Sequence, residues 1–187
     1  MDTLGWILGA IAVVVLVGWY LSYTAARLDR LHGRVEGSAS ALDAQLVRRA
    51  EATLELAGSG ALDPASSLIL ASAATEALES AEAPPAVRSS VESSLTRALG
   101  LALVPEVVTA IDTGDRPGDE LGRQALERLR AAVHRVQLAR RFHNEAVVDV
   151  RRVRRKRVVR WVRLAGHAQL PRTVEFDDEL PGLGPGA

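Results

Sequence analysis

The chain begins with a long, unbroken apolar stretch. Residues 3–26 contain no charged side chain, and LGWILGAIAVVVLVGWYL fills positions 4–21. About 18 to 20 apolar residues, at a helical rise of about 1.5 Å each, cross a hydrocarbon core of roughly 30 Å. Aromatic residues, which favour the membrane interfaces, lie near both ends of the stretch: Trp6, Trp19, Tyr20 and Tyr23. The pattern predicts a transmembrane anchor over residues 1–26.

A cleaved signal peptide is the alternative for this stretch. Signal peptides carry Lys or Arg ahead of the apolar run, whereas Asp2 is the only charged residue ahead of this one. Basic residues instead follow the run, at Arg27, Arg30 and Arg34. Because positive flanks stay in the cytoplasm, we expect an uncleaved single-pass protein of the cell membrane, with its N-terminus outside and residues 27–187 in the cytoplasm.

Beyond the anchor, apolar residues recur at helical spacing. The repeat is close to 3.5 residues, typical of a long helix with one buried stripe, as in coiled coils. The stripe comprises Leu28, Leu31, Val35, Ala39, Leu42, Leu46, Ala50, Leu54 and Ala57. Gly58-Ser59-Gly60 ends this helix, and Asp63-Pro64 suits the start of the next one. We expect Leu42 and Leu46 to lie in the core.

Further helices are predicted over residues 65–82 and 86–103, separated by two prolines, while 106–118 reads as a loop. A last helix begins near Asp119, and after Gly122 neither Gly nor Pro interrupts it before Gly166. Its expected stripe comprises Leu121, Ala125, Leu129, Ala132, Val136, Ala139, Phe142, Ala146, Val150 and Val153. The prediction is an all-α protein: an anchor (1–26), an antiparallel four-helix bundle (27–165), and a Pro/Gly-rich acidic tail (166–187) ordered at most over its first half.

Composition agrees with this class. Hydrophobic residues make up 48% of the 187 residues but aromatics only 4%, a balance that favours helices over a β-sandwich. Cysteine is absent, which excludes disulfides, thiolate metal sites and Cys nucleophiles. The net charge of zero conceals an uneven distribution, with 23 basic and 23 acidic residues.

Two segments and the ending resemble the LemA family of bacterial membrane-anchored helical proteins. LDRLHGRVEGSASALDAQLVRR (28–49) is similar to the helix after that family's anchor, and ARRFHNEAVVD (139–149) to its last helix. PRTVEFDDE (171–179) is similar to its short ending of Phe and acids. The pattern S-x-[IL]-D-x-Q-L-x-R-R is matched by Ser40, Leu42, Asp43, Gln45, Leu46, Arg48 and Arg49. The resemblance implies a cytosolic antiparallel bundle on one anchor, and no catalytic residue.

The polar residues form no recognisable catalytic motif. The four histidines (His32, His134, His143 and His167) are scattered, without partners at metal-ligand spacing. We expect Asp43 with Gln45, and Arg48 with Arg49, to make hydrogen bonds that register the helices. We therefore expect a non-enzymatic interaction or scaffold protein without cofactor or metal, and leave its protein partner and oligomeric state open.

The strongest functional signal is the basic tract RRVRRKRVVRWVR at positions 151–163. Eight like charges without an acid repel one another unless something negative lies nearby. The candidate site comprises Arg151, Arg152, Arg154, Arg155, Lys156, Arg157, Arg160, Trp161 and Arg163. Anionic lipid is the favoured ligand, because a tryptophan beside arginines is typical of interfacial helices. The alternative is a membrane-tethered adaptor that binds nucleic acid.

The helix lengths predict where this tract lies. Residues 27–57 carry the first helix roughly 46 Å away from the bilayer at the usual rise. If neighbouring helices are antiparallel, the last helix needs about the same length, from residue 119 to about 149, to return. The tract that follows would then meet the anionic cytoplasmic leaflet.

Overall fold

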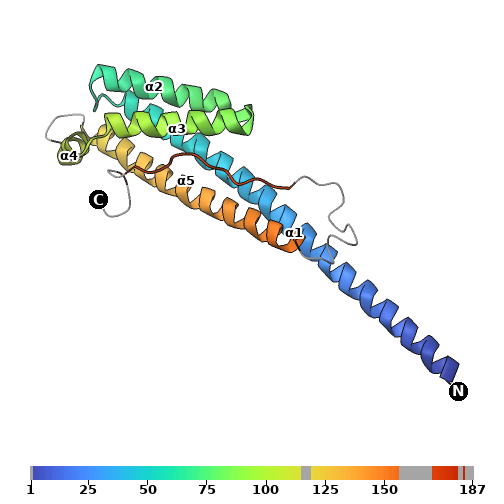
Figure 1. The fold of residues 1–187 in the computed structure, drawn as a ribbon. Helices are drawn as coiled ribbons and strands as arrows, with labels where there is room; N and C mark the ends of the chain where they lie inside the picture. Colours follow the sequence, from blue (N-terminus) through green and yellow to red (C-terminus); the bar gives the residue numbers. More distant parts are fainter. Residues whose placement is uncertain (1, 115–118, 156–169, 181–182, 184–187) are drawn as a thin grey trace. The chain divides into compact units, whose positions relative to one another are not determined.

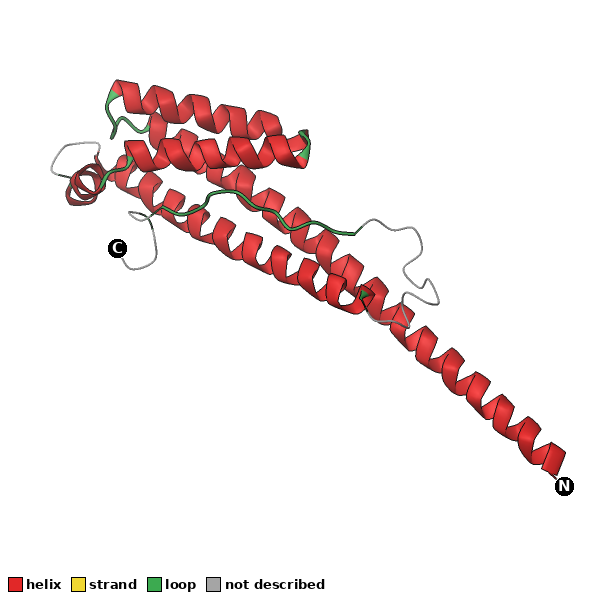
Figure 2. Ribbon diagram, viewed as in Figure 1, coloured by secondary structure: helices red, strands yellow, loops and turns green. Residues whose placement is uncertain are grey.

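The computed structural model describes residues 2–114, 119–155, 170–180 and 183. Its helices are α1 (Asp2–Gly58), α2 (Pro64–Glu79), α3 (Pro85–Ala102), α4 (Pro105–Thr113) and α5 (Asp119–Arg154), with a short 3₁₀ helix, η1, at Ser80–Glu82 (Figure 1). Figure 2 shows helices and loops, and no strand, among these described residues. The predicted all-α class, with a long apolar helix at the N-terminus, is confirmed.

The chain divides into two compact units, and α1 and α5 contribute to both. One unit comprises residues 1–37 and 144–173, and the other comprises residues 38–143 and 174–187. We call them the anchor unit and the bundle unit and describe each separately.

The bundle unit surrounds one large apolar core. Within it α1 and α5 are antiparallel, because Ser38 Oγ lies 3.1 Å from His143 Nδ1 while Glu55, farther along α1, pairs with Arg128, earlier on α5. The helices α2 and α3 lie side by side as a hairpin joined by η1. Buried residues from all five helices fill the core, among them Leu56, Leu70, Leu95, Leu99, Ile111, Leu126 and Leu129. Leu42 and Leu46 are buried as predicted, in a smaller cluster with Val136.

Local sequence explains where α2 begins. The Asp63 carboxylate accepts hydrogen bonds from the backbone N–H groups of Ala65 and Ser66, both at 3.0 Å, and Pro64 occupies the first helical position. Gly60, in the preceding turn, has φ of +79°, a left-handed conformation that glycine adopts without a Cβ penalty.

The loop predicted over residues 106–118 is wrong in its first half, where α4 forms. Pro105 cannot continue α3 but can begin a new helix, and the axes of α3 and α4 meet at 68°. Val108 and Ile111, spaced by three residues, bury themselves in the core and hold this helix. Burial of one short apolar face outweighs the turn-forming residues that follow it.

The predicted stripe of the last helix also needs correction at two positions. Leu121 and Phe142 are more than half exposed, whereas Leu126, Val133 and Val147 are buried. A strict spacing drifts around a helix of 3.6 residues per turn over so long a segment. The prediction that 157–164 extends this helix, or has strand character, lies outside the described residues.

The tail contributes more to the core than its composition predicts. Residues 170–180 follow an irregular, extended path, and Leu180 belongs to the bundle core together with Leu183. Both leucines belong to the second half of 166–187, beyond the part of the tail for which we expected order. Regular secondary structure is not required where apolar side chains gain burial.

Candidate functional site

The exposed apolar surface of α1 is the first element of the site. The N-terminal part of this helix is long enough and apolar enough to span a membrane, and its apolar window is entirely unburied in the protein. Trp6 and Trp19 are 82% and 70% exposed. A contiguous apolar surface of this size on a helix matches a lipid environment.

In the anchor unit, the end of α5 packs against α1 next to this surface. Leu28 and Val153 are buried against each other, with Leu31 beside them. Farther along α1, Arg34 lies 4.0 Å from Asp149. From Leu28 to Arg34 on α1, the contacted residue on α5 changes from Val153 back to Asp149, so the two helices are antiparallel. The basic end of α5 therefore lies at the level where the uncharged stretch of α1 ends.

Arginines from both helices gather at this level, and we call this group the cationic collar: Arg27, Arg30, Arg151, Arg152, Arg154 and Arg155. Residues within two positions of Leu28 or Val153 differ from them in height by about 3 Å. Arg27, Arg30, Arg152 and Arg155 are exposed, whereas Arg151 and Arg154 are half-buried. The Arg151 Nε–H donates to the Pro171 carbonyl at 3.0 Å, which holds that side chain within the protein.

The structure describes only part of the predicted basic tract. Arg151, Arg152, Arg154 and Arg155 lie in the collar, whereas Lys156, Arg157, Arg160, Trp161 and Arg163 lie outside the described residues. The sequence interpretation treated Arg27 and Arg30 only as topology signals. Their position beside the tract depends on the pairing of α1 with α5, which the helix count predicted only approximately.

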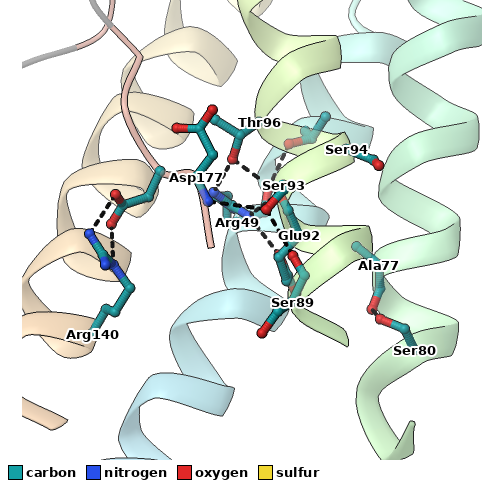
Figure 3. A network of polar contacts seen from close by, with 12 residues as sticks. Arg49, Ala77, Ser80, Ser89, Glu92, Ser93, Ser94, Thr96, Arg140 and Asp177 are labelled. Carbon is teal, nitrogen blue, oxygen red and sulfur yellow. Dashed lines mark hydrogen bonds and ion pairs between the residues drawn. The ribbon is translucent and has the colours of Figure 1, made fainter. Parts of the chain in front are cut away.

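A second polar site lies inside the bundle unit. Arg49 is fully buried, and its guanidinium pairs with the Glu92 carboxylate at 2.6 Å and donates to Thr96 Oγ1 at 3.1 Å (Figure 3). The predicted role of Arg49 in registering helices agrees with these contacts between α1 and α3. Asp43 also contacts α3, through Arg88 at 3.0 Å. Arg48, in contrast, is exposed, and Gln45 is half-buried.

The C-terminal segment joins this site, which the sequence interpretation missed. We call residues 174–180 the strap. The Arg140 guanidinium on α5 donates two hydrogen bonds of 2.8 Å to the Asp178 carboxylate. Arg140 is labelled at the left of Figure 3. Two guanidiniums lie over the Phe176 ring, with the Cζ of Arg49 at 5.9 Å and the Cζ of Arg140 at 5.5 Å from the ring centroid. Val174, Phe176 and Leu180, separated by acidic residues, were the available sequence signal for an extended segment with one apolar face.

A pocket of about 420 Å³ lies in the bundle unit beside the start of α2 and the end of α4. Its walls are polar and apolar in about equal parts, and Asp63 in its lining already caps α2. Hydrogen bonds from Ser66 lower the pKa of this carboxyl below its ordinary value of 3.8, which suits a capping role. Among the described residues, no three His, Asp or Glu side chains converge as metal ligands.

Comparison of the chain with protein-family models, with curated proteins and with solved structures found no match.

Proposed function

We propose that this protein is a single-pass membrane protein that holds a helical interaction module against the cytoplasmic leaflet, where its cationic collar contacts anionic lipid headgroups. The proposal includes the LemA-like character inferred from the sequence and a non-enzymatic role. The observation that carries it is the packing of Val153 on Leu28. This contact supports a return of α5 to the end of the apolar stretch.

Electrostatics favours lipid as the collar's ligand. Each Lys or Arg near an anionic leaflet gains about 1 kcal/mol, and the described collar has six arginines. Asp29 is the acid nearest to Leu28 on α1, whereas Asp149 on α5 pairs with Arg34. A collar directly beside an apolar span lies at the level of the lipid phosphate groups. The lipid headgroups are therefore already next to the arginines when the span is in the membrane.

The orientation follows from the same arginines. Arg27, Arg30 and Arg34 flank the span on its C-terminal side, and the collar adds the arginines of α5 to that flank. Retention of positive flanks in the cytoplasm favours a cytoplasmic bundle unit.

The interaction role is supported by how the bundle unit uses its charges. Arg49 pairs with Glu92, Arg130 with Asp112, and Arg140 with Asp178. These ion pairs connect different segments of the unit, so their physical effect is to fix the fold rather than to position a reacting group. A stable helical module presented at a membrane is suited to binding other proteins.

Amide hydrogen exchange of the full-length protein in nanodiscs tests lipid contact. In discs containing phosphatidylglycerol, residues 144–155 should exchange more slowly than in pure phosphatidylcholine, and raising the salt should remove the difference because it screens the charges. Arg152→Gln with Arg155→Gln should abolish the lipid-dependent protection. The matched control, Arg97→Gln with Arg135→Gln, removes two exposed arginines of the bundle unit and should retain it.

Equal exchange in both lipids would contradict collar binding to headgroups. Protection that appears with added RNA, and not with anionic lipid, would instead favour the nucleic-acid adaptor.

A further inference from the structure

The strap packs along a surface formed by α1, α3 and α5, and we call this surface the groove. Four of its residues, at alternate positions, contact the bundle: Val174 and Phe176 pack on the cluster of Leu42, Leu46 and Val136, while Asp178 and Leu180 are buried. The intervening acidic residues, Glu175, Asp177 and Glu179, are exposed. An extended segment presents successive side chains in opposite directions, so one face of the strap supplies its buried contacts, while the exposed Glu175 adds an ion pair with Arg140 at 3.7 Å.

The groove recognises specific chemistry in that segment. Its floor is apolar, and cationic groups from α1 and α5 lie within 6 Å of the Phe176 ring centroid, an arrangement favourable for cation–π attraction. Two residues later, Arg140 binds the Asp178 carboxylate through a bidentate fork, the geometry that gives arginine its selectivity for carboxylates. An occupant therefore needs an aromatic residue and a carboxylate two positions after it.

Groove side chains also bind the strap's backbone. Ser93 Oγ accepts from the Asp177 N–H at 3.1 Å, and Gln137 Nε2 donates to the Asp178 carbonyl at 2.7 Å. These backbone contacts recognise any extended chain, since every non-proline residue offers the same N–H and C=O groups. Sequence selectivity comes from the side chains that contact Phe176 and Asp178.

We propose that this groove is the module's binding site for extended acidic segments with the pattern Phe-x-Asp, and that the strap is a resident competitor on the same chain. The strap belongs to no helix, so its release breaks no hydrogen bond within a helix. A tethered ligand has a high effective concentration, and a partner segment binds when it displaces the strap. This proposal rests on the interaction role proposed above. The hydrogen-exchange assay in nanodiscs measures lipid contact of the collar alone, so lipid contact and peptide binding by the groove can fail independently.

Charge reversal across the Arg140–Asp178 pair tests the proposal in the full-length protein in detergent. The probe is a fluorescent peptide of residues 172–183, followed by anisotropy. The D178R chain keeps its groove, but its own strap no longer matches the charge of Arg140. Because this tethered competitor is weakened, the D178R chain should bind the wild-type peptide at least about ten-fold more tightly than the wild-type chain does. A peptide carrying D178R should bind the R140D chain instead.

The double variant R140D/D178R is the matched control, because it restores the pair within one chain and should exclude both peptides. Circular dichroism verifies that each variant is folded. If the D178R chain is unfolded, the Phe176→Ala chain is used instead, because it also weakens the binding of the strap to the groove. The proposal is overturned if the wild-type peptide binds opened and wild-type chains equally, or if binding ignores the charge match.

Discussion

At the residue scale, Arg49 and Glu92 are charges in an apolar interior. Both are at most 1% exposed, and their 2.6 Å contact joins α1 to α3. Removing an ion from water costs several kcal/mol even in real proteins. Each charge is tolerated because the other lies against it, and Thr96 and the Phe176 ring provide further contacts for the guanidinium.

Breaking this pair should be severe. Glu92→Gln leaves the buried guanidinium without its counter-charge and should reduce the free energy of unfolding by about 3–5 kcal/mol. The exposed pair of Glu55 with Arg128 is the matched control, and Glu55→Gln should cost about 1 kcal/mol or less because water screens it. Urea unfolding of both variants in detergent measures the contrast. Equal losses would mean that burial of the Arg49 pair has no energetic consequence.

Gly122 is required for a close approach. A Cβ there would lie 2.4 Å from the Ala61 Cβ, so α5 must move from the α1–α2 loop to accept one. Gly122→Ala should therefore destabilise the protein by about 1–3 kcal/mol. Gly37→Ala, where a Cβ meets nothing within 4 Å inside α1, should stabilise it by up to about 1 kcal/mol. A calorimetric melt that ranks the two variants in the opposite order would refute this packing.

At the element scale, α2 depends on a titratable cap. The Asp63 carboxylate accepts its capping bonds when ionised, and the hydrogen bonds from Ser66 lower its pKa in the folded protein. A lowered folded-state pKa contributes stability above the unfolded pKa, and this stability is lost as the pH falls through the folded value. The contribution should therefore begin to fall below about pH 4 and be lost once the pH is below the folded-state pKa.

Asp63→Asn isolates this effect, because Asn also caps helices but does not titrate in this range. The variant should melt below the wild type near neutral pH, where the ionised Asp63 carboxylate adds stability, and should lose less than the wild type as the pH falls from about 5 to 2. Parallel acid melts of the two chains would show this as converging curves. A constant gap between them would argue that Asp63 is not the titrating cap.

How far sequence predicts these elements depends on what stabilises each one. The long stripes from Leu28 to Ala57 and along α5 repeat many times, so periodicity was sufficient to find both helices. The α4 helix buries only two residues of one face, Val108 and Ile111, a signal too short to outweigh the turn residues after it. The strap has no repeat of its own, since its burial depends on Arg140 and on a groove that exists only after folding.

At the scale of the whole molecule, the two units have different physical roles. The bundle unit has a closed core and internal ion pairs, whereas the anchor unit combines an exposed apolar helix with arginines at its boundary. Sequence alone located the apolar stretch and the basic tract. The packing of Val153 on Leu28 depends on the register between α1 and α5, which no local pattern specifies.

Single-cysteine labelling in intact cells tests the central claim, membrane anchoring with a cytoplasmic bundle. The chain contains no cysteine, so Thr3→Cys and Arg97→Cys each introduce one thiol, ahead of the apolar stretch and on the surface of α3. A membrane-impermeant maleimide should label the Thr3→Cys protein in intact cells and the Arg97→Cys protein only after permeabilisation. Labelling of Arg97→Cys in intact cells would contradict the cytoplasmic assignment, and recovery of either protein in the soluble fraction would contradict the anchor.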